Sequence, residues 1–385
     1  MIARTALRIA APVLLILAIV AIFLANDPLQ RFTGSVPPVE ELTVERTILD
    51  SGGISMLVRA GGSEPMRIAQ IQVDGAYWSF TQDPPGTLDR MATAWLNIPY
   101  PWVTGETHHI TMVTSTGVTF DHTIDVAVTT PSISANTLWS YGLVGFFVGV
   151  VPVALGMLFY PALRVGGMRA FAFALALTIG LLGFLLVDTL EEALKLAGEA
   201  APGFHGPAMV WLAAALSFIA LMTAGRRKGA TLGSVGLAVS IALGIGLHNL
   251  GEGLAIGSAF ATGAASLGSF LVIGFTLHNI TEGIGIVAPL VDRKPRFSVF
   301  IGLAALAGLP AVAGVWLGSY AFSPHWAALA LAVGAGAILQ VIVEVGALLA
   351  RRMQSNGGSW ASVTTLSGIS VGIALMYATA FLVQI

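Results

Sequence analysis

Eight apolar segments of membrane-spanning length follow Pro131, and they constrain the fold of this chain more than any other feature. A stretch of about 20 mostly apolar residues can cross the hydrocarbon core of a bilayer as a helix. The segments span residues 137–160, 169–195, 207–225, 232–258, 265–290, 297–321, 325–350 and 361–383. Only 10% of the residues are charged, whereas soluble domains carry about 25%. The sequence therefore predicts an all-α polytopic membrane bundle over residues 137–385 rather than a soluble enzyme.

The N-terminus has the pattern of a membrane anchor. Arg4 and Arg8 precede an apolar run from Ile9 to Leu24. The end of this run lacks the small-x-small pattern of a signal-peptide cleavage site. We expect residues 1–26 to form an uncleaved signal-anchor helix.

The segment 27–131 is polar and differs from both its neighbours. It alternates apolar and polar residues at 68–73, 109–113 and 123–128, and turn residues cluster between these stretches. Short alternating strands separated by turns are typical of a small β-sandwich. We predict one such domain here, on the extracytoplasmic side.

The positive charges predict the orientation of the bundle, because loops rich in Lys and Arg stay in the cytoplasm. Four basic clusters fall in alternate loops, all on one side. They contain Arg164 and Arg169; Arg226, Arg227 and Lys228; Arg293, Lys294 and Arg296; and Arg351 and Arg352. This pattern places the N-terminus inside and residues 27–131 outside. It predicts a multi-pass protein of the cell (plasma or inner) membrane.

Ionisable residues within the predicted spans are few. An ionised carboxylate at mid-membrane costs roughly 2.5–3.5 kcal/mol, so such residues usually face the bundle interior and have a function. Apart from Arg169, Lys195 and His325 at the ends of the spans, they are Asp188, Glu191, Glu192, His248, Glu252, His278, Glu282 and Glu344.

The pattern His-Asn-x-x-Glu-Gly occurs twice, at 248–253 and 278–283. In each copy the His and Glu are four residues apart and share one helical face. The short link at 261–266 predicts an antiparallel hairpin, with both histidines 15 residues from Gly263 and therefore at equal depth. At 1.5 Å rise per residue, Glu252 lies about 6 Å outward of its imidazole and Glu282 about 6 Å inward.

Imidazole and carboxylate suit zinc and its first-row neighbours, and the chain has no cysteine to offer instead. The motif predicts a metal site formed by His248, Asn249, Glu252, His278, Asn279 and Glu282. Zinc or a similar dication would be the transported substrate. The alternative is a buried interhelical hydrogen-bond network. The neighbouring glycines are explained either by close helix packing or by local unwinding.

Other polar residues are candidates for supporting roles. Asp188 and Glu192 share a face near the outer end of their helix and could form an entrance site, or simply an interfacial pair. Glu344 could line an exit route or pair across the bundle. His205 and His325 lie in predicted outer loops and are expected to be solvated. His108, His109 and His122 lie in the predicted β-domain and are expected to be structural, with metal capture as the alternative.

The paired motif resembles the ZIP family of divalent metal transporters. Residues 248–257 read HNLGEGLAIG, and 278–290 read HNITEGIGIVAPL, similar to the family's paired signatures. The resemblance covers about 137–383. It implies ligation by the two histidines and two glutamates, with Asn249 and Asn279 near a second ion. It also implies transport toward the cytoplasm by an elevator-like movement of bundle helices 1, 4, 5 and 6.

Three positions depart from the family pattern: Gly251 and Thr281 replace prolines, and Leu309 stands where many members have Glu. With only two shared carboxylates, we expect one tightly bound ion rather than two.

The sequence thus predicts a transporter and not an enzyme. A membrane metal sensor and an intramembrane metallohydrolase remain alternatives. The expected partners are a divalent metal ion and the lipid bilayer. A net charge of −2 argues against nucleic acid, and a homodimer is left open.

Overall fold

The computed structural model describes residues 14–22, 39–132, 134–224, 233–261, 265–321 and 323–383. Residues 41–385 form one compact unit and residues 1–40 another. Within the predicted anchor, residues 14–22 are helical. Its other residues lie outside the described ranges.

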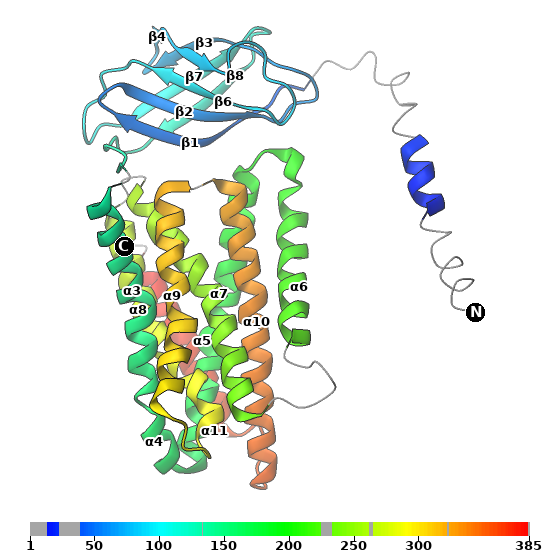
Figure 1. Cartoon of the computed structure of the whole chain (residues 1–385), viewed down its shortest axis with the longest axis vertical. Coiled ribbons are helices and arrows are strands. Elements are labelled where there is room, and N and C mark those ends of the chain that lie inside the picture. The colour runs from blue at the N-terminus through cyan, green and yellow to red at the C-terminus, as the bar shows by residue number, and fades with distance from the viewer. Residues whose placement is uncertain are drawn as a thin grey trace. The chain divides into compact units, whose positions relative to one another are not determined.

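The polar N-terminal segment folds into two four-stranded antiparallel sheets, ordered β1-β2-β6-β5 and β4-β3-β7-β8 (Figure 1). The strands are β1 Leu42–Asp50, β2 Gly53–Ala60, β3 Ile68–Val73, β4 Ala76–Trp78, β5 Thr81–Asp83, β6 Thr93–Ile98, β7 His108–Thr114 and β8 Thr119–Ile124. One apolar core joins the two sheets, with Ile54 and Leu96 from the first and Ile71 and Met112 from the second. We refer to this sandwich as the β-domain.

The predicted strand at 123–128 is placed wrongly, because β8 ends at Ile124. Beyond it the chain pairs with the loop before β7 instead of continuing the ladder. Ala127 N donates to Glu106 O, and Gly105 N donates to Ala127 O, each at 2.8 Å. The alternation of apolar residues there reflects burial of Ala127 and not a strand.

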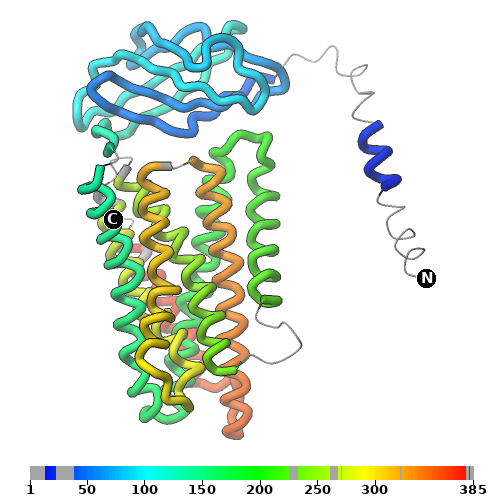
Figure 2. Tube along the Cα trace, viewed as in Figure 1, coloured from blue at the N-terminus to red at the C-terminus, as the bar shows by residue number. Residues whose placement is uncertain are grey.

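From Ala135 onward the described part of the chain is mostly helical (Figures 1 and 2). The α-helices are α3 Ala135–Met157, α4 Tyr160–Val165, α5 Gly167–Glu199, α6 Gly206–Ala224, α7 Ser234–Ala261, α8 Ala265–Val287, α9 Phe297–Ala321, α10 Pro324–Ser355 and α11 Val363–Val383. Short 3₁₀ turns, η1 Pro202–Phe204 and η2 Ala288–Leu290, follow α5 and α8. Among the described residues, seven helical stretches are long and apolar enough to cross a membrane. A shorter apolar stretch, Val363–Ala378, lies in α11.

These helices match the eight predicted segments. The predicted turn of α7 into α8 at residues 262–264, including Gly263, lies outside the described residues. So does the basic cluster Arg226, Arg227 and Lys228.

The helices pack in two groups. α7 packs closely on α9, and α3 packs on α8 and α9; we call these four helices the α7 group. α5 packs on α10 and α11, and α6 packs on α10; these four form the α5 group. The groups meet where α7 lies against α10 and where α8 lies against α5.

Glycines bring the backbones of α7 and α9 into direct contact. A Cβ on Gly253 would lie 2.2 Å from the carbonyl oxygen of Ala311, and one on Gly314 would lie 2.2 Å from that of Leu250. Any side chain at these positions would force the two helices apart.

Candidate metal centre

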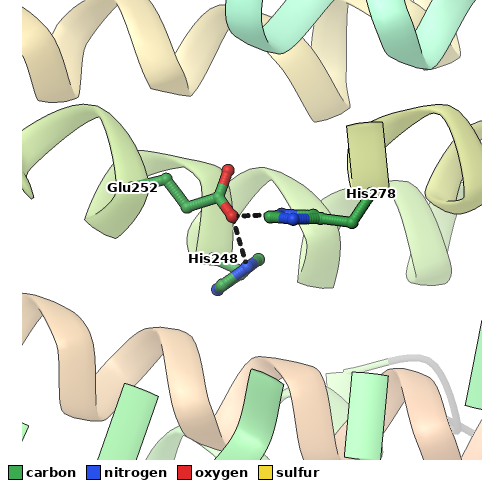
Figure 3. Close-up of side chains that lie close together, drawn as sticks. All are labelled: His248, Glu252 and His278. Carbon is green, nitrogen blue, oxygen red and sulfur yellow. Dashed lines mark hydrogen bonds and ion pairs between the residues drawn. The ribbon is translucent and has the colours of Figure 1, made fainter. Parts of the chain in front are cut away.

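A carboxylate lies between two imidazoles in the interior of the helical bundle (Figure 3). Oε1 of Glu252 is 3.0 Å from Nε2 of His248, one turn earlier on α7. The same oxygen is 2.5 Å from Nε2 of His278 on α8. Each of the three residues is 3% exposed. The i, i+4 spacing therefore aligns the α7 pair as predicted, and the neighbouring helix supplies the third group.

These three side chains each present a ligand atom within 4.8 Å of the others. Two imidazoles and one carboxylate are a common protein donor set for zinc, and a further position stays free for another ligand. The nitrogen atoms that face Glu252 must be deprotonated to bind a cation. Protons and metal therefore compete for this cluster.

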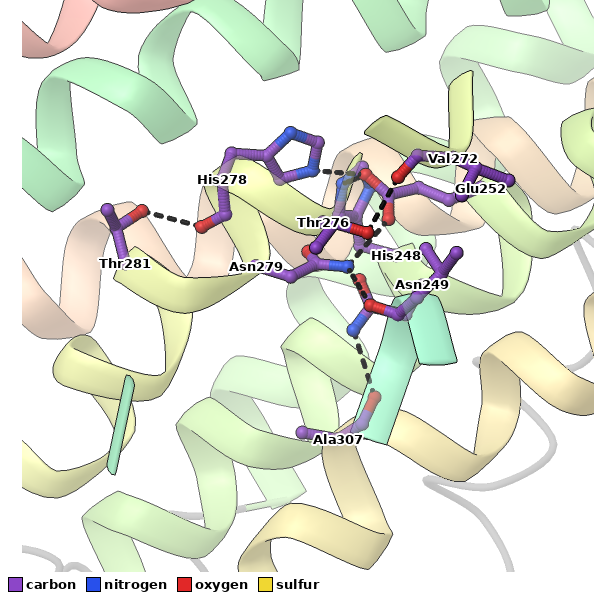
Figure 4. A network of polar contacts seen from close by, with 10 residues as sticks. His248, Asn249, Glu252, Val272, Thr276, His278, Asn279, Thr281 and Ala307 are labelled. Atoms are coloured by element: carbon purple, nitrogen blue, oxygen red, sulfur yellow. Dashed lines mark hydrogen bonds and ion pairs between the residues drawn. The ribbon is translucent and has the colours of Figure 1, made fainter. Parts of the chain in front are cut away.

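The two asparagines of the repeated motif are fully buried and hydrogen-bonded through their amide nitrogens (Figure 4). Nδ2 of Asn249 donates to Ala307 O at 3.0 Å. Nδ2 of Asn279 donates to Val148 O at 3.1 Å and to Glu252 Oε2 at 3.2 Å. Among the residues that the structure describes, the Oδ1 atom of each amide has no hydrogen-bond partner. Both oxygens remain free to act as weak metal ligands.

The second glutamate lies outside the group of three but close to it. Glu282 is 1% exposed and interacts electrostatically with Glu252 and Asn249. Neither of its carboxylate oxygens has a hydrogen-bond partner within the described ranges. A buried carboxylate without a partner is unfavourable unless it is protonated or a cation is nearby.

The glycines that end the two motifs serve helix packing. Gly253 adjoins the Ala311 carbonyl, and a Cβ on Gly283 would lie 2.2 Å from the carbonyl oxygen of Val153 on α3. α7 runs unbroken through its motif from Ser234 to Ala261. The unwinding alternative is therefore not observed at residues 248–253. α8 also runs unbroken through the second motif, at 278–283, and ends at Val287. Pro289 lies beyond this end, in the 3₁₀ turn η2.

The proposed entrance residues lie on α5 outside the cluster. Asp188 is exposed, yet it is within electrostatic range of both His248 and His278. Glu192 is 3.7 Å from the ammonium group of Lys195 and is exposed. Glu344 is 5% exposed on α10 and is not part of the three-residue cluster.

The remaining histidines have separate surroundings. His205 is exposed, and His109 bonds Thr123 at 3.1 Å on the surface of the β-domain. His122 bonds Thr47 at 3.0 Å, and burial lowers the pKa of its imidazole. His108 and His325 are buried.

Two further positions bear on the site. Gln340 on α10 is fully buried and donates to Ser240 Oγ on α7 at 3.0 Å, where the two helix groups meet. Gln340 is not ionisable and is therefore not among the candidates above; a strongly polar side chain within an apolar span is the sequence signal that identifies it. Leu309 is 49% exposed on α9, so its side chain points away from the cluster. The residue type at 309 therefore says little about how many ions the site holds.

No protein-family model matches this chain, and no characterised protein matches it in sequence.

Proposed function

We propose that this protein carries divalent metal ions, zinc or a first-row neighbour, across a membrane toward the cytoplasm. The observation that supports this most is the buried cluster of His248, Glu252 and His278 on two helices of membrane-spanning length. A dication that crosses hydrocarbon must exchange its water shell for protein ligands. This cluster offers such ligands where lipid cannot.

Unsatisfied atoms around the cluster favour a cation over a static hydrogen-bond network. Native networks satisfy nearly all their buried polar groups. Within the described part of the chain, the Oδ1 atoms of Asn249 and Asn279 and both carboxylate oxygens of Glu282 have no hydrogen-bond partner. A bound dication near Glu252 would offset the carboxylate charge and orient these oxygens. All six residues of the predicted site are included in this proposal.

The helix packing is compatible with a carrier. The cluster lies wholly on α7 and α8, two members of the α7 group. Asp188 belongs to the α5 group, as does Gln340, which contacts α7. If the α7 group moved as one rigid body against the α5 group, it would carry the cluster past Asp188 and Gln340. Such movement is the elevator-like step that the family resemblance implies.

The direction follows from the charge pattern. The Arg and Lys residues in α4 and the first turn of α5, after η2, and in the last two turns of α10 would face the cytoplasm. The β-domain would then be extracytoplasmic, and Asp188 would attract ions from that side. We propose a carrier and not an enzyme.

Uptake into sealed proteoliposomes that contain a fluorescent zinc indicator tests the proposal. We expect zinc-dependent signal from the wild type and only the background of empty liposomes from Glu252→Gln. Glu64→Gln, on the exposed surface of the β-domain, is the control and should retain uptake. Equal signal from wild type and empty liposomes would overturn the proposal. Zinc binding without uptake would favour a sensor, and peptide cleavage by the same protein would favour a hydrolase.

A further inference from the structure

A buried ion pair of the β-domain contacts the loop ends of the helical bundle. Glu45 on β1 is 6% exposed and binds Arg59 on β2 through both carboxylate oxygens, at 2.5 Å and 3.1 Å. Oε1 of the same carboxylate lies 3.5 Å from Nδ1 of His325 in the first turn of α10. One acidic group thus bridges a cation of the β-domain and an imidazole of the bundle.

An aromatic ring from the turn between α5 and α6 completes this contact. Phe204 stacks on the imidazole of His325, with ring centres 4.2 Å apart and planes 10° from parallel. The guanidinium carbon of Arg59 lies 5.3 Å from the centre of the same Phe204 ring. Ser323 Oγ bonds Nδ1 of His325 at 2.9 Å. We call Glu45, Arg59, Phe204 and His325 the Glu45 seat.

The backbone around the seat is closely packed. A Cβ on Gly203 would lie 2.4 Å from the sulfur of Met91, in the loop before β6. Arg59 Nη1 donates to Met91 O at 2.6 Å. The turn η1 therefore lies against the Met91 side chain of the β-domain, which would have to shift to make room for a substituent at 203.

Every helical residue of the seat belongs to the α5 group. Phe204 lies between α5 and α6, and His325 lies on α10. Buried charge pairs contribute little net stability, but they impose a particular geometry, because a misplaced partner leaves a charge unpaired. The Glu45 seat therefore favours one docked position of the β-domain on this group.

We propose that the β-domain is a fixed outer part of the α5 group and stays docked on it while the α7 group moves. The movement in this statement rests on the proposed transport function; the docking does not. A route for ions would remain beside the seat. A cavity of about 770 Å³ is lined there by β1 and β8, by Glu199, by Gly318 and Ser319 of α9, and by Pro324.

Cysteine cross-linking tests the docking, since the chain contains no cysteine of its own. In full-length protein, Met91→Cys with Gly203→Cys should form a cross-link with a short methanethiosulfonate reagent. Tyr77→Cys with Gly203→Cys is the control, because β4 is the far edge strand of the other sheet. Equal cross-linking of the two pairs would overturn the docking.

Variants of the seat test its chemistry. Glu45→Gln should slow the Met91–Gly203 cross-link by about tenfold, since it leaves Arg59 without its buried counter-charge. His325→Ala, which leaves the β-domain itself intact, should also slow it. Glu64→Gln, on the exposed surface of the β-domain, should leave the rate of this cross-link unchanged. An unchanged rate in both seat variants would show that the Glu45 seat does not hold the domain.

Uptake by the cross-linked protein tests the movement. The Met91–Gly203 link should leave zinc uptake at the level of the unlinked double variant. A Ser240→Cys and Gln340→Cys link, which joins α7 to α10, should stop uptake. Loss of uptake on forming the Met91–Gly203 link would overturn the proposal that the domain stays docked. Failure of the unlinked proteins to take up zinc would instead contradict the proposed function, while the cross-linking rates would still decide the docking.

Discussion

The imidazole of His278 on α8 reaches the carboxylate of Glu252 on α7, with 2.5 Å between Nε2 and Oε1. Asn279 donates to the other oxygen of the same carboxylate at 3.2 Å. Glu252 is therefore the point at which the two copies of the repeated motif meet. Metal binding should depend on this residue more than on any other in the cluster.

Glu252→Gln keeps the shape of the side chain but removes its charge. Loss of one partner from a buried charged cluster typically costs about 3–5 kcal/mol, which corresponds to a more than hundredfold weaker zinc affinity. Titration calorimetry on the purified protein measures this. Glu199→Gln should bind as the wild type does. A change of less than threefold in Glu252→Gln would argue that zinc binds elsewhere.

Glu282→Gln should separate stability from binding. The buried carboxylate of Glu282 has no hydrogen-bond partner among the described residues, so a neutral amide should stabilise the metal-free protein. We expect its melting temperature to rise by about 2–4 °C, as a gain of roughly 1 kcal/mol would produce. Zinc affinity should fall at the same time. A lower melting temperature together with unchanged affinity would refute this role.

Zinc uptake should decrease on acidification. A protonated imidazole cannot bind metal, so protons compete with zinc for the ring nitrogens of the cluster. Uptake should therefore be higher in neutral medium and fall as the medium is acidified. His205→Ala, on an exposed histidine, should keep the wild-type profile. If the His248→Ala and His278→Ala variants also kept the wild-type pH profile, groups other than these two histidines would cause the pH dependence of uptake.

Asp188→Asn should reduce the rate of uptake more than the affinity. The carboxylate is exposed and interacts electrostatically with both imidazoles, so it can attract ions without ligating them tightly. Initial rates at low zinc should fall several-fold, and the difference should shrink at high ionic strength, where charges are screened. An equal loss of calorimetric affinity would instead make Asp188 a ligand.

Asp74 should make the β-domain sensitive to acid. Partial burial raises the pKa of this carboxyl, but hydrogen bonds from His109 N–H at 2.8 Å, His108 at 2.8 Å and Tyr100 at 2.9 Å hold the pKa below its usual range. A lowered pKa in the folded state contributes stability above the unfolded pKa of about 3.9, and this is lost as the pH falls through the folded value.

Guanidinium unfolding of the full-length protein, followed by tryptophan fluorescence, measures that contribution. Trp78, which packs edge-on against Tyr100, reports on this region. Asp74→Asn should be less stable than the wild type at pH 7 and match it near pH 2–3. If the stability difference between the wild type and Asp74→Asn did not vary with pH, the ionised carboxylate would not be its source.

The sequence predicted the helices well, because long apolar runs have few alternative structures in a membrane. The helix α9 begins and ends at Phe297 and Ala321, the bounds expected from hydropathy. The i, i+4 alignment of His248 and Glu252 also follows from helical geometry. Which residue of the neighbouring helix reaches this pair does not follow, because it depends on the rotation of each helix about its axis.

At other positions, too, the direction of a side chain could not be predicted from the sequence. The family pattern indicates a missing ligand at Leu309, yet this side chain faces away from the cluster because helix packing directs Ala307 and Ala311 inward instead. The Glu45 seat joins residues far apart in the chain, and none of the four belongs to a recognisable motif. Such contacts arise from tertiary packing.

The backbone contact of Gly253 and Gly314 has a consequence for how this protein tolerates mutation. A side chain at either glycine would separate α7 from α9, whereas the contact of α7 with α10 runs through side chains such as Gln340, which can readjust. A saturation library selected for metal-dependent growth should therefore be depleted of nearly all substitutions along the α7–α9 seam and permissive along the α7–α10 seam. The pattern of surviving variants would outline the rigid body in living cells without any structure determination.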